Sequence, residues 1–229
     1  MSARVASSRE IADSFVACLG RAERTDRPWT YWLIDKVLPD ETCDAVIGLP
    51  VPPAEVEDTY GRRETSNAKR WHFNADNRRK FPVCEAIAGA FQSAQVVRAI
   101  QETCATDLKG TSLRIEYCQD QGGFWLEPHT DIGVKRYTML IYLAGGPGSE
   151  NWGTDVLDPE QDYKRVARAP YGRNRGLIFV PGDDTWHAYE KREMKGIRRL
   201  LMLNFVGPEW RARHELAFPD RPVGADGSF

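Results

Sequence analysis

Two histidines and an aspartate have the residue types and the order of a metal site. His129 and Asp131 are two residues apart in FWLEPHTDIGVK (124–135), and His187 follows in FVPGDDTWHAYEK (179–191). Alternate residues of a strand project to the same face, so a His-x-Asp pair at a strand end can point both side chains at one ion. Alone, this pair could equally be the polar end of a strand. The later histidine makes a metal site the stronger interpretation.

An arginine after the second histidine could hold an anion beside the metal. Two imidazoles and one carboxylate on one face of octahedral iron(II) leave three adjacent positions open, which a bidentate 2-oxo acid and dioxygen can fill. A guanidinium fork could then bind the far carboxylate of 2-oxoglutarate. Arg198 and Arg199 both open the run RRLLMLNFV (198–206), and strand neighbours face opposite sides, so only one can enter the site. The apolar periodicity of this run favours Arg199.

The residues around these groups are predicted to form short strands. From Thr111 onward, runs rich in β-branched and aromatic residues are separated by Gly, Pro, Asn and Asp clusters, a pattern typical of an antiparallel sandwich or jelly roll. These runs are SLRIEYCQ, FWLEP, RYTMLIYLA, GLIFV and RRLLMLNFV. We expect the second histidine to come from a strand opposite the first in the sandwich, which would explain their long separation in the sequence.

The first half of the chain is predicted to be mainly helical. Ser7 and Glu10 have capping-box spacing, and apolar residues then recur at helical intervals, so we expect a helix over 8–22. Further predictions are a strand over 29–38, a short helix from Asp40 through Ile47, and two helices within 82–104 that break near Gln92–Ser93. The predicted fold class is therefore α+β, a jelly-roll core with N-terminal and flanking helices.

The chain is expected to form one domain. Its predicted parts are a helical first part (1–110), a metal-binding core (111–206) and a C-terminal tail (207–229) within 1–229. The polar segment 50–80 is unusually long for a connection in a compact domain, so we interpret it as a lid, together with AGGPGSENWG (144–153).

Composition points away from several other kinds of protein. A net charge of −2 and a pI of about 6.1 give no sign of a nucleic-acid or membrane surface. The five cysteines are scattered without a C-x-x-C pair, which argues against a disulfide framework and for a reducing compartment. With no signal peptide and no long apolar run, the expected location is cytoplasmic. The oligomeric state stays open.

Five stretches together resemble a known family. They are GGFWLEPHTD (122–131), KRYTMLIYL (135–143), WGTDV (152–156), GLIFVPGDDTWHAY (176–189) and GIRRLLMLNF (196–205). They resemble the iron(II)/2-oxoglutarate-dependent oxygenases of the double-stranded β-helix fold, most nearly the branch containing the prolyl 4-hydroxylases. The resemblance covers about 111–206.

Specific roles follow from this resemblance. It implies that His129, Asp131 and His187 bind iron, and its Gly-x-Arg pattern favours Arg198 over Arg199 as the residue that pairs with 2-oxoglutarate. The branch often has a tyrosine nine residues before the first histidine, where this chain has Asp120. Tyr117 is the nearest tyrosine and the candidate for that role.

The resemblance also implies an activity. It would be hydroxylation of an unactivated C–H bond of a small molecule by dioxygen, with Fe(II) and 2-oxoglutarate as cofactors, ascorbate as a stimulant, and release of succinate and CO2. An aspartate at position 131, rather than a small residue, favours a hydroxylase over a halogenase. Desaturation or ring closure would use the same iron site.

Four further residues are candidates for the pocket or for support of the ligands. Trp125 and Trp186 adjoin the proposed site in sequence, although aromatic residues in strands are more often core. Glu127 alternates in phase with His129 unless Pro128 breaks the phase, and Asn204 shares the face of Arg198.

Two other functions fit some of these residues. One is a jelly-roll binding module with a vestigial metal site, and the other is a zinc-dependent hydrolase, because a His₂Asp set also suits zinc. A zinc hydrolase would leave Arg198 without a role and would lack an evident general base.

Overall fold

A computed structural model of the chain describes residues 4–53, 60–62 and 70–225, and these form two antiparallel sheets. The large sheet has the order β1 (Glu23–Thr25), β2 (Tyr31–Asp35), β9 (Arg175–Phe179), β6 (Lys135–Tyr142), β11 (Arg198–Val206), β4 (Ser112–Asp120) and β3 (Trp71–His72). The small sheet has the order β5 (Leu126–His129), β10 (His187–Tyr189), β7 (Asp155–Asp158) and β8 (Lys164–Arg168). This arrangement confirms the predicted jelly-roll core.

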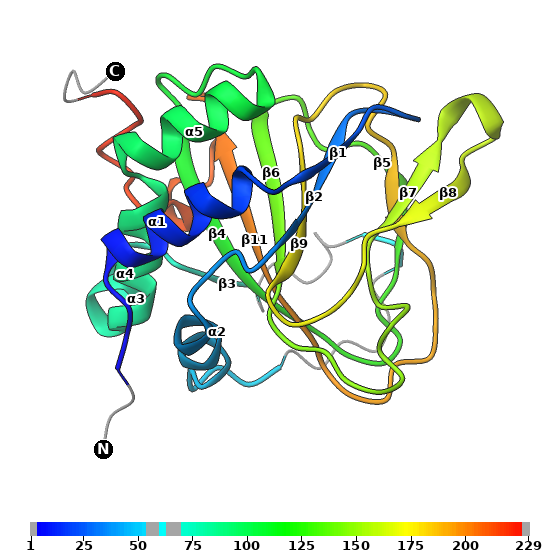
Figure 1. Cartoon of the computed structure of the whole chain (residues 1–229), viewed down its shortest axis with the longest axis horizontal. Helices are drawn as coiled ribbons and strands as arrows, with labels where there is room; N and C mark the ends of the chain where they lie inside the picture. Colours follow the sequence, from blue (N-terminus) through cyan, green and yellow to red (C-terminus); the bar gives the residue numbers. More distant parts are fainter. Residues whose placement is uncertain (1–3, 54–59, 63–69, 226–229) are drawn as a thin grey trace.

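Helices cover one side of the large sheet, and the small sheet lies on the other (Figure 1). The helices are α1 (Ser8–Leu19), α2 (Asp40–Ile47), α3 (Ala75–Lys80), α4 (Pro82–Phe91) and α5 (Ala94–Cys104), with short 3₁₀ turns at Pro159–Gln161 and Arg213–Glu215. Ser7 and Glu10 form the predicted capping box of α1, and Ser93 caps α5, which explains the break after α4. The α+β class is confirmed.

Alternation along β11 separates two apolar cores. Leu201, Leu203 and Phe205 point toward the helices and belong to the larger core. Leu200 belongs to the core between the two sheets, together with residues of β9 and β10. Among the residues that the structure describes, this second core is the one to which both sheets contribute.

Several boundaries differ from those predicted. Strand β2 ends at Asp35 because Lys36 adopts a positive φ of 48°, which extended strand backbone does not tolerate. The segment 50–80 contains β3 and α3 at its end, and its residues 54–59 and 63–69 lie outside the described part of the chain. The β7–β8 hairpin was not predicted. Within the described residues, every helix is too short or too polar to cross a lipid bilayer.

Candidate metal centre

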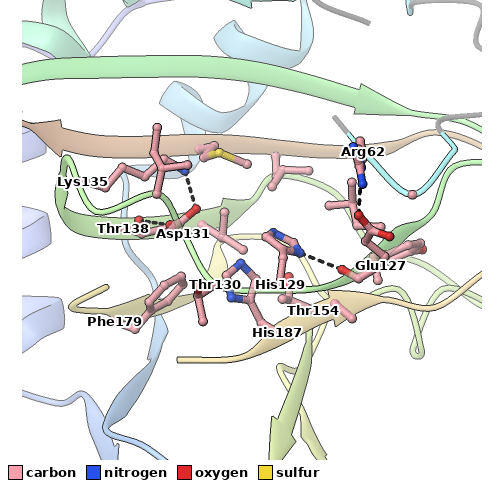
Figure 2. A pocket seen from close by; sticks show the side chains of 18 of the residues that line it. Arg62, Glu127, His129, Thr130, Asp131, Lys135, Thr138, Thr154, Phe179 and His187 are labelled. Carbon is pink, nitrogen blue, oxygen red and sulfur yellow. Dashed lines mark hydrogen bonds and ion pairs between the residues drawn. The ribbon is translucent and has the colours of Figure 1, made fainter. Parts of the chain in front are cut away.

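The two histidines lie side by side on neighbouring strands of the small sheet. His129 ends β5, His187 begins β10, and the register pairs them directly, with ring centroids 4.3 Å apart (Figure 2). The expectation that they come from opposite sides of the sandwich is therefore wrong. Asp131 follows just beyond β5, and the nearest ligand atoms of the three residues all lie within 4.8 Å of one another. The structure thus brings the three predicted metal ligands together.

Backbone carbonyls set the tautomer of both imidazoles. Nδ1 of His129 lies 2.7 Å from the carbonyl oxygen of Glu127, and Nδ1 of His187 lies 2.9 Å from that of Thr185. A carbonyl only accepts, so each Nδ1 carries a proton, and in the neutral form of each imidazole the lone pair is on Nε2. Burial, followed by the neighbouring His129, lowers the pKa of His187 to about 4. The neutral form that binds a metal therefore prevails at neutral pH.

Two donors hold the third ligand as a carboxylate. Lys135 donates to Oδ1 of Asp131, and the Thr138 hydroxyl donates to Oδ2 at 2.6 Å (Figure 2). Burial alone would raise the pKa of Asp131, but the charge of Lys135, followed by His187 and by the hydrogen bonds from Lys135 and Thr138, more than offsets it. The pKa of this carboxyl is held well below its usual range, so Asp131 is an anion.

Support for Asp131 continues inward through buried polar groups. Asn204 Nδ2 donates to Thr138 Oγ1 at 2.9 Å, and Arg114 Nη1 donates to Asn204 Oδ1 at 3.2 Å. Both Asn204 and Arg114 have no exposed surface. Asn204 was predicted to lie in or near the pocket, and it acts on Asp131 through Thr138.

Replacing Thr138 with valine should weaken metal binding. Valine keeps the side-chain volume but removes the hydroxyl that orients Asp131, and loss of such an outer hydrogen bond typically costs about 10- to 100-fold in metal affinity. Titration calorimetry with Mn(II) measures this. Thr138→Ser retains the hydroxyl and should bind Mn(II) like the natural protein. Equal weakening in both variants would contradict this prediction, because serine keeps the hydroxyl that valine lacks.

A cavity of about 520 Å³ adjoins the three residues. Its lining includes His129, Asp131, His187, Arg198, Thr154 and Leu200. Arg198 is only 2% exposed. Arg199, its neighbour on β11, belongs to the opposite face of the sheet, which carries the helix-side core. Between the two arginines, the one that lines the cavity is Arg198.

Tyr117 lies outside the cavity, contrary to the prediction. It pairs with Leu201 across β4 and β11, and both belong to the core between the large sheet and the helices. The side chain of Tyr117 therefore lies behind the sheet, away from the cavity, and we withdraw its role in binding an oxo acid. A tyrosine three residues from the expected position falls on the opposite face, because strand residues alternate.

The other predicted residues lie at the edge of the site or outside it. Glu127 lines the cavity and forms an ion pair with Arg62 at 3.0 Å. The ring of Trp125 packs against Gly61, which lines the rim. Trp186 contacts Tyr163 of the β7–β8 hairpin with tilted rings whose centroids are 4.5 Å apart, so its side chain packs on this hairpin.

A buried charged cluster borders the same cavity and was not predicted. Arg114 donates to Glu116 at 2.9 Å and to Glu215 at 2.6 Å, and its Nη2 lies 2.9 Å from Nε2 of His72. Arg70 makes a two-pronged contact with Glu116 at 3.1 and 2.6 Å. Arginine only donates, so Nε2 of His72 is the acceptor and the imidazole is neutral. Burial, followed by Arg114, lowers the pKa of His72 to about 4.

This neutral imidazole should make the protein less stable in acid. Unfolded histidine takes up a proton near pH 6.5, whereas folded His72 does so only near 4, so stability present above pH 6.5 is lost as the pH falls toward 4. The contribution of His72 to this loss between pH 7 and 4 should be about 3 kcal/mol. Urea unfolding across this range measures it. His72→Gln should flatten the profile and exposed His214→Gln should not; parallel profiles for all three proteins would contradict this assignment.

The donor set fits a resident divalent ion. Two neutral imidazole nitrogens and one carboxylate oxygen are ligands suited to Fe(II), Mn(II) or Zn(II), and three protein ligands leave positions open for a substrate or water. The buried arginine at the same cavity adds a cation that can hold an acidic group.

Comparison with known proteins supports the fold. A scan of protein-family models found no match, and a search of curated proteins found none. Among solved structures, a prolyl 4-hydroxylase from Phytophthora capsici is 17% identical over 90% of this chain and 67% of its own, with a TM-score of 0.58. One from Pseudomonas putida is 13% identical over 90% and 98% of the two chains, with a TM-score of 0.53.

A third solved structure is a prolyl hydroxylase from Trichoplax adhaerens in complex with a hypoxia inducible factor peptide fragment. It is 18% identical over 90% of this chain and 93% of its own, with a TM-score of 0.56. These likenesses confirm, at the level of the fold, the resemblance to the prolyl 4-hydroxylase branch.

Proposed function

We propose that this chain is an Fe(II)- and 2-oxoglutarate-dependent dioxygenase of the hydroxylase type. The observation that carries the proposal is the meeting of His129, Asp131 and His187 at a cavity that also contains buried Arg198. The fold shared with the prolyl 4-hydroxylases supports it. A bound Fe(II) would supply the redox chemistry that couples decarboxylation of a 2-oxo acid to oxidation of a C–H bond.

The protein's own residues bind and orient in this proposal. The two imidazoles and Asp131 hold the ion, and Arg198 holds the far carboxylate of 2-oxoglutarate. Apolar Leu140 and Leu200 line the cavity beside Arg198 and limit the entry of water. Arg198 favours an oxo-acid enzyme over a zinc hydrolase, because a zinc hydrolase would have no use for this arginine. The oriented imidazoles favour an enzyme over a vestigial binding module, because such a module would not need them.

We propose a small molecule as the substrate. The cavity of about 520 Å³ has the size of a small-molecule site and must also take the oxo acid. The complex of the Trichoplax adhaerens relative with a peptide fragment supports a protein residue as the second candidate substrate.

Succinate release tests the proposed activity. The protein, loaded anaerobically with Fe(II) and given 2-oxoglutarate and then dioxygen, should form succinate slowly without a substrate. A screen of metabolites and proline-containing peptides should find compounds that accelerate succinate release and gain one oxygen by mass. Release that is equally fast in His129→Ala and His187→Ala would reject the proposal.

A further inference from the structure

The arginine at the cavity is already paired with a carboxylate of the protein. Arg198 Nη1 donates to Asp120 Oδ2 at 2.6 Å, and the two side chains are only 3% and 5% exposed. The pairing of two strands positions this contact, because the register of β11 and β4 places Arg198 directly opposite Asp120.

Other contacts fix the guanidinium in place. Its Nε donates to the carbonyl of Trp152 at 2.7 Å, and its Nη2 donates to Thr154 Oγ1 at 3.3 Å. The rings of Tyr189 and Tyr142 lie 4.5 and 5.5 Å from its central carbon. Hydrogen bonds and aromatic rings therefore fix the position of the Arg198 guanidinium. A ligand carboxylate that binds this guanidinium must do so while Asp120 is also bound to it.

Charge at this end of the cavity then decides which ligands bind well. The charges of the Arg198 guanidinium and the Asp120 carboxylate sum to zero. The terminal carboxylate of an oxo acid would therefore enter a buried region that has no net positive charge to offset its own. The other cations of the described cavity lining, Lys135, Arg62 and Arg70, are already paired with Asp131, Glu127 and Glu116. An uncharged ligand group meets no such repulsion.

We propose that Asp120 determines the specificity of the site for the oxo acid. By neutralising Arg198, it reduces the preference for a 2-oxo acid with a second carboxylate and lets the cavity accept one of equal length with an uncharged end. This inference rests on the proposed function, because it concerns the tail of the oxo acid that would bind the metal.

Binding of two matched oxo acids to the natural protein and to Asp120→Asn tests the proposal. 2-Oxoglutarate and 2-oxopentanoate have the same chain length and differ in the terminal carboxylate. Calorimetry with Mn(II) in the metal site measures binding without turnover. Because close buried charge pairs couple by more than a factor of ten, Asp120→Asn should tighten 2-oxoglutarate binding by about tenfold or more. Binding of 2-oxopentanoate should change by less than about twofold, since asparagine keeps the size and the acceptor oxygen.

The outcomes separate this inference from the proposed function. If both acids bind with Mn(II) but change by the same factor, or if 2-oxoglutarate binds more weakly to the variant, Asp120 only positions Arg198 and the specificity role is wrong. If Mn(II) binds and neither acid does in either protein, the proposed function fails and the inference fails with it. Asp120→Ser, which also removes the charge, gives the same comparison if Asp120→Asn does not fold.

Discussion

Replacing His187 with alanine is expected to abolish high-affinity binding of a divalent metal ion. This residue supplies one of three ligands, and its Nε2 is kept available by the contact of Nδ1 with the Thr185 carbonyl. Loss of a direct ligand should exceed the 10- to 100-fold cost of losing an outer hydrogen bond, so we expect a loss of more than about 100-fold. Equilibrium dialysis with Mn(II) measures the affinity.

A matched histidine provides the control for this prediction. His214 is exposed on the 3₁₀ turn Arg213–Glu215, and His214→Ala should bind Mn(II) like the natural protein. Circular dichroism must show that His187→Ala is folded, because the imidazole is buried. Folded His187→Ala with unchanged Mn(II) affinity would remove this residue from the metal site.

Replacing Arg198 with alanine is expected to raise the 2-oxoglutarate concentration for half-saturation strongly. Loss of a charged partner in a buried pocket costs about 2–5 kcal/mol, and Asp120 would then face the ligand carboxylate without its counter-ion. Arg199→Ala should change the value little, because Arg199 lies on the other face of β11. Binding of 2-oxoglutarate in the presence of Mn(II) decides between the two residues.

A double variant separates the effect on the ligand from the effect on folding. Arg198→Ala leaves buried Asp120 without its partner, which destabilises the protein by about 3–5 kcal/mol in comparable cases. Arg198→Ala with Asp120→Ala removes both charges, so it should be more stable and bind 2-oxoglutarate better than Arg198→Ala alone. A strong loss of binding in Arg199→Ala, with Arg198→Ala unaffected, would reverse the assignment.

The candidate ligands His129, Asp131 and His187 could be predicted from the sequence because their residue types, order and spacing form a recognisable pattern. The His-x-Asp spacing places two ligands near one strand end, and the second histidine follows a Pro-Gly turn. The pairing of His129 with His187 was not predicted, since periodicity identifies strands but not which strands are neighbours. The one-domain division of the chain stays a prediction.

The sequence did not predict which face of a strand a side chain occupies, nor which residues of distant strands are in contact. Tyr117 lies on the wrong side of β4, and the positions of Arg198 and Arg199 gave conflicting patterns because both faces of β11 are covered. The contact of Arg198 with Asp120 depends on the register of β11 and β4, which no local pattern encodes. The β7–β8 hairpin escaped prediction because DVLD is half aspartate, a residue depleted in strands.

We expect the proposed metal ligands and the oxo acid to share one site, and thermal unfolding in the presence of both ligands is the measurement that tests this. A ligand that binds the folded state raises the melting temperature. Under anaerobic conditions, 2-oxoglutarate should raise the melting temperature when Fe(II) is present and have little effect without it, and His129→Ala should lose this dependence. A rise with 2-oxoglutarate that is the same with and without Fe(II), or that persists in His129→Ala, would contradict the claim.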